Sequence, residues 1–129
     1  MKAAKLNLVT LSCKPEYLGE AGEKREACRE CGLSEHCNSP FMQPYIPEGW
    51  EEGERILEVG EAPGDHEDNE SGRPFTGSAG KILRRLNQWA GLEKRDVAYV
   101  NAVRCRPRNN ATPTVKQVRC CRPFLLRTI

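Results

Sequence analysis

Two short apolar runs in the second half of the chain predict buried β-strands, at residues 55–59 and 97–100. A helix is expected between them, from about Ser78 to a stop at Gly91. Its apolar residues recur at helical spacing and should face a sheet: Ile82, Leu83, Leu86 and Trp89. The order strand, helix, strand predicts a parallel β-α-β unit, in which Asn101 ends the second strand level with the loop that ends the first.

The segments around this unit are less regular. Residues 38–54 are rich in proline, so no regular element is expected there. Weak periodicity predicts a short helix within residues 16–29. A last helix should begin at Thr112 and Pro113, with a hydroxyl cap and a proline in its first turn, and Pro123 should kink or restart it.

The length and hydropathy of the chain indicate one domain that covers residues 1–129. The elements predict an α/β fold with a parallel sheet, and two strands are fewer than a doubly wound sheet uses, so we expect an incomplete fold. No apolar run approaches the roughly 18 residues of a membrane span, and the first residues lack the apolar core of a secretory signal. We therefore expect an intracellular, cytoplasmic protein without a membrane partner.

The charge is unevenly distributed along the chain, although the net charge is only +2. From Asn101 to Ile129 there are seven bases and no acid, whereas the other 100 residues hold 13 bases and 18 acids, a net charge of −5. This asymmetry indicates a polyanion as partner. A solvated basic helix is the alternative.

Seven cysteines in a chain expected to be intracellular favour metal or redox chemistry over disulfides. Cys28 and Cys31 form a C-x2-C pair, and a second group follows at Cys105, Cys120 and Cys121. Four thiolates would hold zinc or an iron–sulfur cluster, and ligand identity does not separate these. The gap of 73 residues between the groups is unlike a compact zinc ribbon and favours a cluster. Cysteines without a shared ligand are the alternative.

The stretch GEAPGDHED at residues 60–68 follows the first strand directly. In open α/β sheets ligands bind beyond the carboxyl ends of the strands, and glycines there allow backbone N–H groups to approach a ligand closely. The stretch is therefore interpreted as the floor of a pocket. For Asp65 and His66 a solvated acidic turn is the preferred interpretation.

Five segments occur in this order along the chain: CRECGLS at 28–34, GEAPGDHED at 60–68, GRPFTGSAGKIL at 72–83, NAVRCRPRNNATP at 101–113 and CRPFL at 121–125. In these segments the chain resembles the amino-terminal two-thirds of the family 4 uracil-DNA glycosylases, the iron–sulfur type of bacteria and archaea. The resemblance implies a three-layer α/β/α domain with a mainly parallel sheet, incomplete at its carboxyl end. It also implies a DNA repair hydrolase that removes uracil by base flipping and acts on uracil-containing DNA as a monomer.

The resemblance further implies a 4Fe-4S cluster bound by segments 28–31 and 105–121. Its ligands would be four cysteines: Cys28, Cys31, Cys105 and Cys121. Cys120 would then be a neighbour of the cluster, and Cys13 and Cys37 would be free thiols. Phosphate contacts are expected from the basic end of the chain, through Arg106, Arg108 and Arg119.

A glycosylase must hold the flipped base in a pocket that reads one edge of it. The Asn101 amide would accept from uracil N3–H and donate to O4, and Phe75 would stack on the ring. The alternatives are a turn residue for Asn101 and a core residue for Phe75. The uracil contacts are expected from six residues: Gly60, Glu61, Ala62, Gly64, Phe75 and Asn101.

Bond cleavage needs stabilisation of the departing uracil anion and a positioned water. Backbone N–H groups of residues 60–64 would stabilise the anion. Related glycosylases carry an acid for the water where this chain has Ala62, and family 4 lacks it, so Glu61 and Glu67 are the expected catalytic acids.

One family motif, a later histidine-containing loop on the uracil, has no counterpart here, since the only histidines are His36 and His66. We therefore expect the 129-residue chain to release uracil weakly or not at all, and a carboxyl-terminally extended chain to release it clearly. Two alternatives stay open: an iron–sulfur DNA-binding module without catalysis, and a zinc-binding interaction domain.

Overall fold

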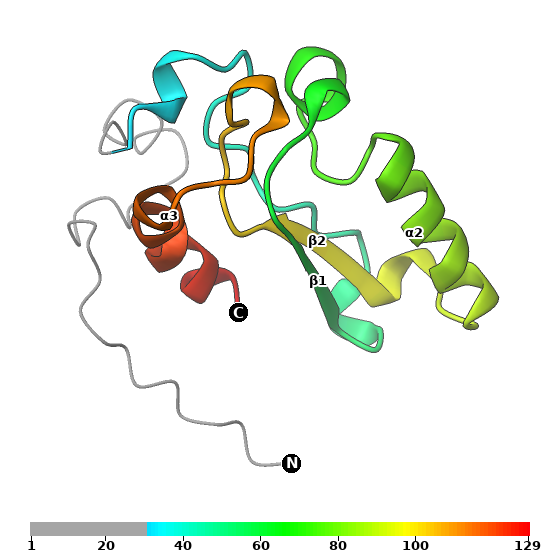
Figure 1. Cartoon of the computed structure of the whole chain (residues 1–129). Coiled ribbons are helices and arrows are strands. Elements are labelled where there is room, and N and C mark those ends of the chain that lie inside the picture. The colour runs from blue at the N-terminus through cyan, green and yellow to red at the C-terminus, as the bar shows by residue number, and fades with distance from the viewer. Residues whose placement is uncertain (1–30) are drawn as a thin grey trace.

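The computed structural model describes residues 31–129, in which two adjacent strands lie between two helices (Figure 1). In chain order the elements are β1 Ile56–Gly60, α2 Ser78–Trp89, β2 Val97–Asn101 and α3 Val115–Thr128. The strands are parallel, as predicted, and each observed strand ends one residue beyond the predicted one. The helix expected within residues 16–29 lies outside the described residues.

The register of the two strands places their carboxyl ends side by side, since Gly60 pairs with Asn101. The pairing continues beyond the strands: Ala102 N–H donates to the Gly60 carbonyl at 2.8 Å and Val103 N–H to the Glu61 carbonyl at 3.0 Å. On its other edge β2 forms an antiparallel bridge through Tyr99. All five residues of β2 are buried, so this strand is the centre of the described sheet.

The apolar stripe predicted for α2 does not face the strands, and this prediction was wrong. Three of its four residues are exposed to solvent: Ile82 at 63%, Leu86 at 49% and Trp89 at 77%. The side of α2 toward β2 carries Arg84, whose guanidinium carbon lies 4.7 Å from the Tyr99 ring centroid, and Asn87, which donates to the Tyr99 hydroxyl at 3.2 Å. The ring face and hydroxyl of Tyr99 thus favour polar partners on this side of the helix.

Helix α3 begins two residues later than predicted. Its N-cap is Thr114, whose hydroxyl accepts from Gln117 N–H at 3.3 Å while the Gln117 side chain accepts from Thr114 N–H at 2.9 Å. This reciprocal capping box outweighs the hydroxyl of Thr112. The helix also runs through the buried Pro123 without a break, so the predicted restart is not observed.

The segment 38–54 is largely irregular, as predicted, with one turn of 3-10 helix at Trp50–Glu52. It nevertheless contributes to the core, because Phe41 and Met42 are buried. The Phe41 ring packs edge-on against Phe124 of α3 with centroids 4.6 Å apart. This contact ties the segment that follows the first cysteine group to the helix that carries the last one.

These elements confirm the predicted α/β class, with α2 and α3 on opposite sides of the strands in Figure 1. Within residues 31–129, no helix has both the length and the apolar character needed to cross a bilayer.

Candidate functional site

Three of the predicted pocket residues converge where the two strands end. A methyl carbon placed on Gly60 would lie 2.6 Å from Asn101 Oδ1 and 2.6 Å from Cζ of Phe75. The absence of a side chain at Gly60 therefore leaves room for the amide and the ring together. Gly60, which lies 41 residues before Asn101 in the sequence, meets it here because the strands are parallel and in register. Phe75, which lies 26 residues before Asn101, reaches the same point from the segment that precedes α2.

The Asn101 side chain is buried yet unpaired. Asn101 is 7% exposed, and among the described residues its amide has no hydrogen-bond partner. Both hydrogen-bonding groups of Asn101 are thus free for a bound molecule.

Phe75 is held in an uncommon backbone conformation, with φ of 58°. The preceding residue, Pro74, is fully buried. The carbonyl oxygen of Phe75 would lie only 2.1 Å from a methyl carbon placed on Gly80 of α2, so the Phe75 backbone packs closely against this helix. The ring lies 5.1 Å from that of Tyr99, centroid to centroid. A strained, tightly packed residue of this kind is typical of a functional site.

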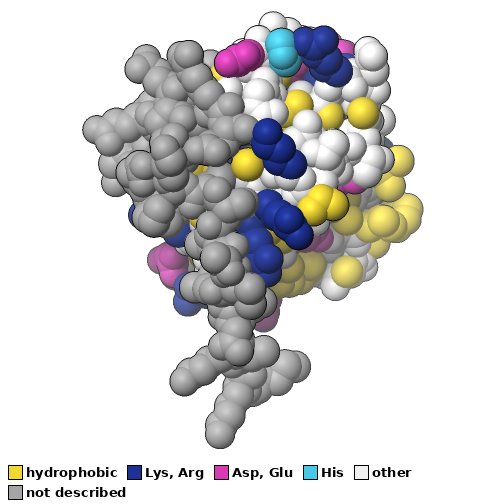
Figure 2. Space-filling view, turned by 60° about the vertical axis from the view of Figure 1, so that its left-hand side comes forward, with side chains coloured by type: hydrophobic (Ala, Val, Ile, Leu, Met, Phe, Trp, Pro, Cys, Tyr) yellow, Lys and Arg dark blue, Asp and Glu magenta, His cyan; other side chains and the backbone are white. Residues whose placement is uncertain are grey.

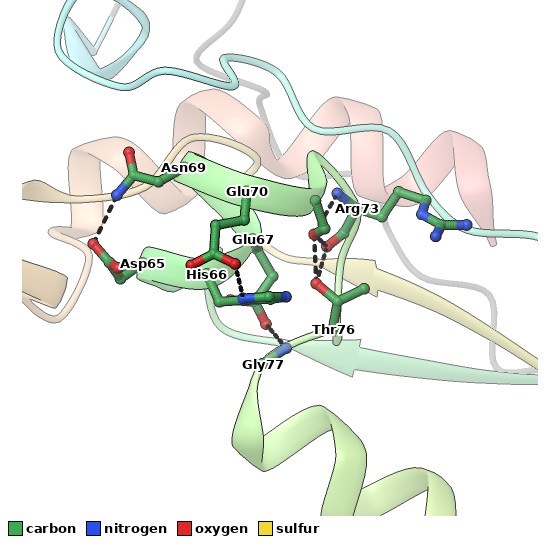
Figure 3. Close-up of polar contacts among 9 residues, drawn as sticks. Asp65, His66, Glu67, Asn69, Glu70, Arg73, Thr76 and Gly77 are labelled. Atoms are coloured by element: carbon green, nitrogen blue, oxygen red, sulfur yellow. Dashed lines mark hydrogen bonds and ion pairs between the residues drawn. The ribbon is translucent and has the colours of Figure 1, made fainter.

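The two predicted catalytic acids have different surroundings. Glu61 is exposed. Glu67 lies in a short π-helical turn, Glu67–Ser71, and its Oε1 accepts from Gly77 N–H at 3.0 Å, immediately before α2 (Figure 3). The same carboxylate reaches within 2.9 Å of a methyl carbon placed on Gly64. Glu67 therefore links the glycine loop to the start of α2, where the positive end of the helix dipole favours a carboxylate.

The other polar residues of this turn pair mainly with one another. Figure 3 shows His66 paired with Glu70, at 3.1 Å, and Asn69 donating to Asp65, at 2.7 Å. These contacts support the interpretation of Asp65 and His66 as a solvated acidic turn. The turn does not direct either side chain to Asn101 or Phe75 in any contact that the structure describes.

Asp68 differs from its neighbours because it is buried, at 4% exposed. Its carboxylate accepts from Ser39 N–H at 2.7 Å, and its carbonyl accepts from the Ser39 hydroxyl at 2.7 Å. The pocket loop is thereby fastened to the segment that follows the first cysteine group.

Two of the three arginines predicted to contact DNA already have protein partners. Arg106 pairs with Asp65 at 2.9 Å, and its side chain is only 20% exposed. Arg108 contacts Nδ1 of His36 at 2.8 Å, while Arg119 is exposed on α3. On the face drawn in Figure 2, basic side chains lie at separate points, one of them beside a histidine. DNA contact by these arginines stays a prediction.

Three of the four predicted cluster ligands lie together, and Cys28 lies outside the described residues. Cys105 and Cys121 belong to a buried apolar cluster with Leu33 and Val103, and Cys31 packs against it. Ala62 of the pocket loop packs there as well, so the cysteine cluster adjoins the loop. As placed, no group of three metal-binding side chains in residues 31–129 forms a metal site.

Cys37, predicted to be a free thiol, packs against this same cluster, which sequence reasoning missed. The Cys105 thiol donates a hydrogen bond to Cys37; this bond raises the pKa of Cys105, with burial acting in the same direction, and lowers the pKa of Cys37. Burial also raises the pKa of Cys121 to about 11. The described cysteines are free of disulfides.

Comparison with known proteins places this site in a family. The profile of the uracil DNA glycosylase superfamily matches residues 47–129. Type-4 uracil-DNA glycosylases are similar to this chain: that of Sulfurisphaera tokodaii is 42% identical over 116 residues, which is 88% of this chain and 50% of the relative. The Saccharolobus solfataricus enzyme is 41% identical over 103 residues, 79% of this chain and 45% of the relative.

The type-4 enzyme of Thermotoga maritima is 39% identical over 116 residues, 90% of this chain and 57% of the relative. The chain thus spans about half the length of the curated relatives it matches. The profile match, which covers more than half of the chain, and these relatives confirm the resemblance drawn from the motifs. The chain belongs to the uracil DNA glycosylase superfamily.

Proposed function

We propose that this chain binds uracil flipped out of DNA between Gly60, Phe75 and Asn101 and supports hydrolysis of its N-glycosidic bond. The observation that carries the proposal is the convergence of a bare glycine, an aromatic ring and a buried, unpaired amide at the carboxyl ends of two parallel strands. The type-4 relatives, which are named for action on uracil in DNA, support the choice of base.

The Asn101 amide supplies the selectivity in this proposal. Its oxygen accepts from uracil N3–H and its nitrogen donates to O4, whereas cytosine presents the reversed pattern on this edge. Phe75 stacks on the base, a contact worth about 1–3 kcal/mol. Because Asn101 has no described protein partner, binding uracil would not cost it an existing hydrogen bond.

Hydrolysis needs groups that stabilise the departing base and hold a water. Backbone N–H groups of Glu61, Ala62 and Gly64 lie on the loop that leaves β1 and serve the first need. Of the two candidate acids, Glu61 is exposed, while Glu67 already accepts from Gly77. Glu61 is therefore the stronger candidate to hold the water, and Glu67 contributes by positioning the start of α2.

A 4Fe-4S cluster held by Cys28, Cys31, Cys105 and Cys121 is part of the proposal. The donor set fits: three of these thiols lie against one buried apolar cluster and none of the three is in a disulfide. When bound, the cluster would cross-link the segments 28–31 and 105–121 next to the pocket loop. Zinc would suit the same thiols, so the visible absorption of anaerobically purified protein distinguishes the two.

The DNA partner is proposed to bind through the acid-free end of the chain. Residues 101–129 hold seven bases and no acid, so phosphate contacts there would release counterions. The protein is proposed to act as an intracellular monomer.

Uracil release from a single-stranded oligonucleotide tests the function. The comparison uses this chain and a chimera in which the part of the Thermotoga maritima relative beyond the aligned region follows Ile129. We expect clear release by the chimera, and loss of activity in the chimera with Phe75→Ala. Folded, DNA-binding protein without uracil release in either form would favour the non-catalytic module.

A further inference from the structure

Arg104 is a buried arginine for which the described residues offer no carboxylate. It is 5% exposed, between the end of β2 and Cys105. Its Nη2 donates to the carbonyl of Phe124 at 3.1 Å and to the hydroxyl of Thr128 at 2.9 Å, and its Nε is buried without a partner. Neutral acceptors thus satisfy part of the guanidinium, and no described anion offsets its charge.

The aromatic rings around Arg104 belong to segments that contact or carry the proposed cluster ligands. The guanidinium carbon lies 5.1 Å from the Phe41 ring centroid and 5.9 Å from that of Phe124. Phe41 N–H donates to Cys105 Sγ at 3.2 Å, and Phe124 lies one helical turn after Cys121 on α3. The cation is therefore enclosed between the segment that contacts Cys105 and the helix that carries Cys121.

Arg104 is close to two of the proposed ligands in the chain and in space. It directly precedes Cys105, and its Nη2 donates to the carbonyl of Phe124, three residues after Cys121 on α3. A buried, unpaired cation is unfavourable by itself, so an anion beside it gains stability. Four thiolates on an oxidised 4Fe-4S core give such a site a net negative charge, which becomes more negative on reduction.

We propose that Arg104 is the buried counter-charge of the cluster, stabilising its thiolate-bound form and raising its reduction potential. This inference rests on the cluster of the proposed function and not on uracil release. It assigns Arg104 to the cofactor and not to DNA, although Arg104 lies in the basic end of the chain.

The test compares three variants of the full chain with the wild type. Arg104→Gln removes the charge, Arg104→Lys keeps the charge but loses the forked geometry, and Arg122→Gln removes an exposed charge next to Cys121 in sequence. Iron content, the rate of iron loss to a chelator and the reduction potential, followed by electron paramagnetic resonance, are measured for each.

We expect Arg104→Gln to lower the equilibrium constant for reduction at least tenfold, about 59 mV for a one-electron couple, and to speed iron loss. Arg104→Lys should change both less, and Arg122→Gln should change neither. An unchanged potential and iron-loss rate in Arg104→Gln would overturn the proposal. So would equal iron loss in the Gln and Lys variants, since hydrogen bonding to α3 would then be the cause.

Wild-type protein that binds no iron would also overturn the proposal, whereas the separate uracil-release assay decides the proposed function.

Discussion

A methyl group at Gly60 tests directly whether ring and amide share one pocket. In Gly60→Ala the new carbon would lie 2.6 Å from Phe75 Cζ and 2.6 Å from Asn101 Oδ1. Carbon contacts are comfortable at 3.5–4.0 Å, so the ring and the amide must each move by roughly 1 Å. Neither neighbour is the free end of a flexible chain, because Asn101 is buried in β2 and the Phe75 backbone abuts Gly80.

The displacement should weaken base binding and also lower the stability of the fold. Loss of stacking alone is worth about 1–3 kcal/mol, or roughly 5- to 150-fold in affinity. Overpacking should lower the free energy of unfolding by about 1–3 kcal/mol. Gly53→Ala is the matched control for overpacking away from the strand ends, since its methyl carbon would lie 2.7 Å from Asp96 Oδ1 and 2.9 Å from the Arg95 carbonyl oxygen.

The assay is the affinity for single-stranded oligonucleotides that differ by one uracil or thymine, with thermal unfolding measured on the same samples. We expect Gly60→Ala to lose its preference for uracil while remaining folded, and Gly53→Ala to keep that preference. Undiminished uracil preference in Gly60→Ala would refute the shared pocket.

Three further predictions concern residues around the pocket. Glu67→Gln should lower the free energy of unfolding by about 1 kcal/mol, because a charge is lost at the start of α2; lost activity with unchanged thermal stability would instead make Glu67 a catalytic acid. Iron analysis should show that Cys28→Ala and Cys121→Ala lose iron, whereas Cys13→Ala keeps it; equal iron content in all three variants would remove the ligand assignment. Charge reversal of Arg106, Arg108 and Arg119 together should lower both the DNA affinity and its salt dependence. No change in either quantity would contradict the proposed polyanion interface.

The meeting of Gly60 and Asn101 could be predicted from the sequence because it follows from topology. Parallel strands end at one edge of a sheet, so Gly60 at the end of β1 and Asn101 at the end of β2 had to meet once the strands were recognised. The contact of Phe75 with Gly60 is less direct, since it depends on a positive φ and on the close approach of α2 at Gly80.

Other features depend on contacts that a linear pattern does not contain. Helical periodicity located the apolar face of α2, but the rings of Tyr45 and Tyr99 draw Arg84 to the inner side. The charge pattern counted Arg104 among the bases of a polyanion-binding end, whereas Arg104 is buried against two phenylalanines. The T-x-x-Q spacing from Thr114 was the one available signal for the true start of α3.

The most direct measurement of the central claim is the nuclear magnetic resonance signal of the Asn101 side-chain amide during titration with free uracil. Asn101 is buried and its amide has no partner within the described residues, so uracil should shift both amide proton signals, and cytosine should not. Asn101 signals that stay fixed at saturating uracil would contradict the proposed pocket.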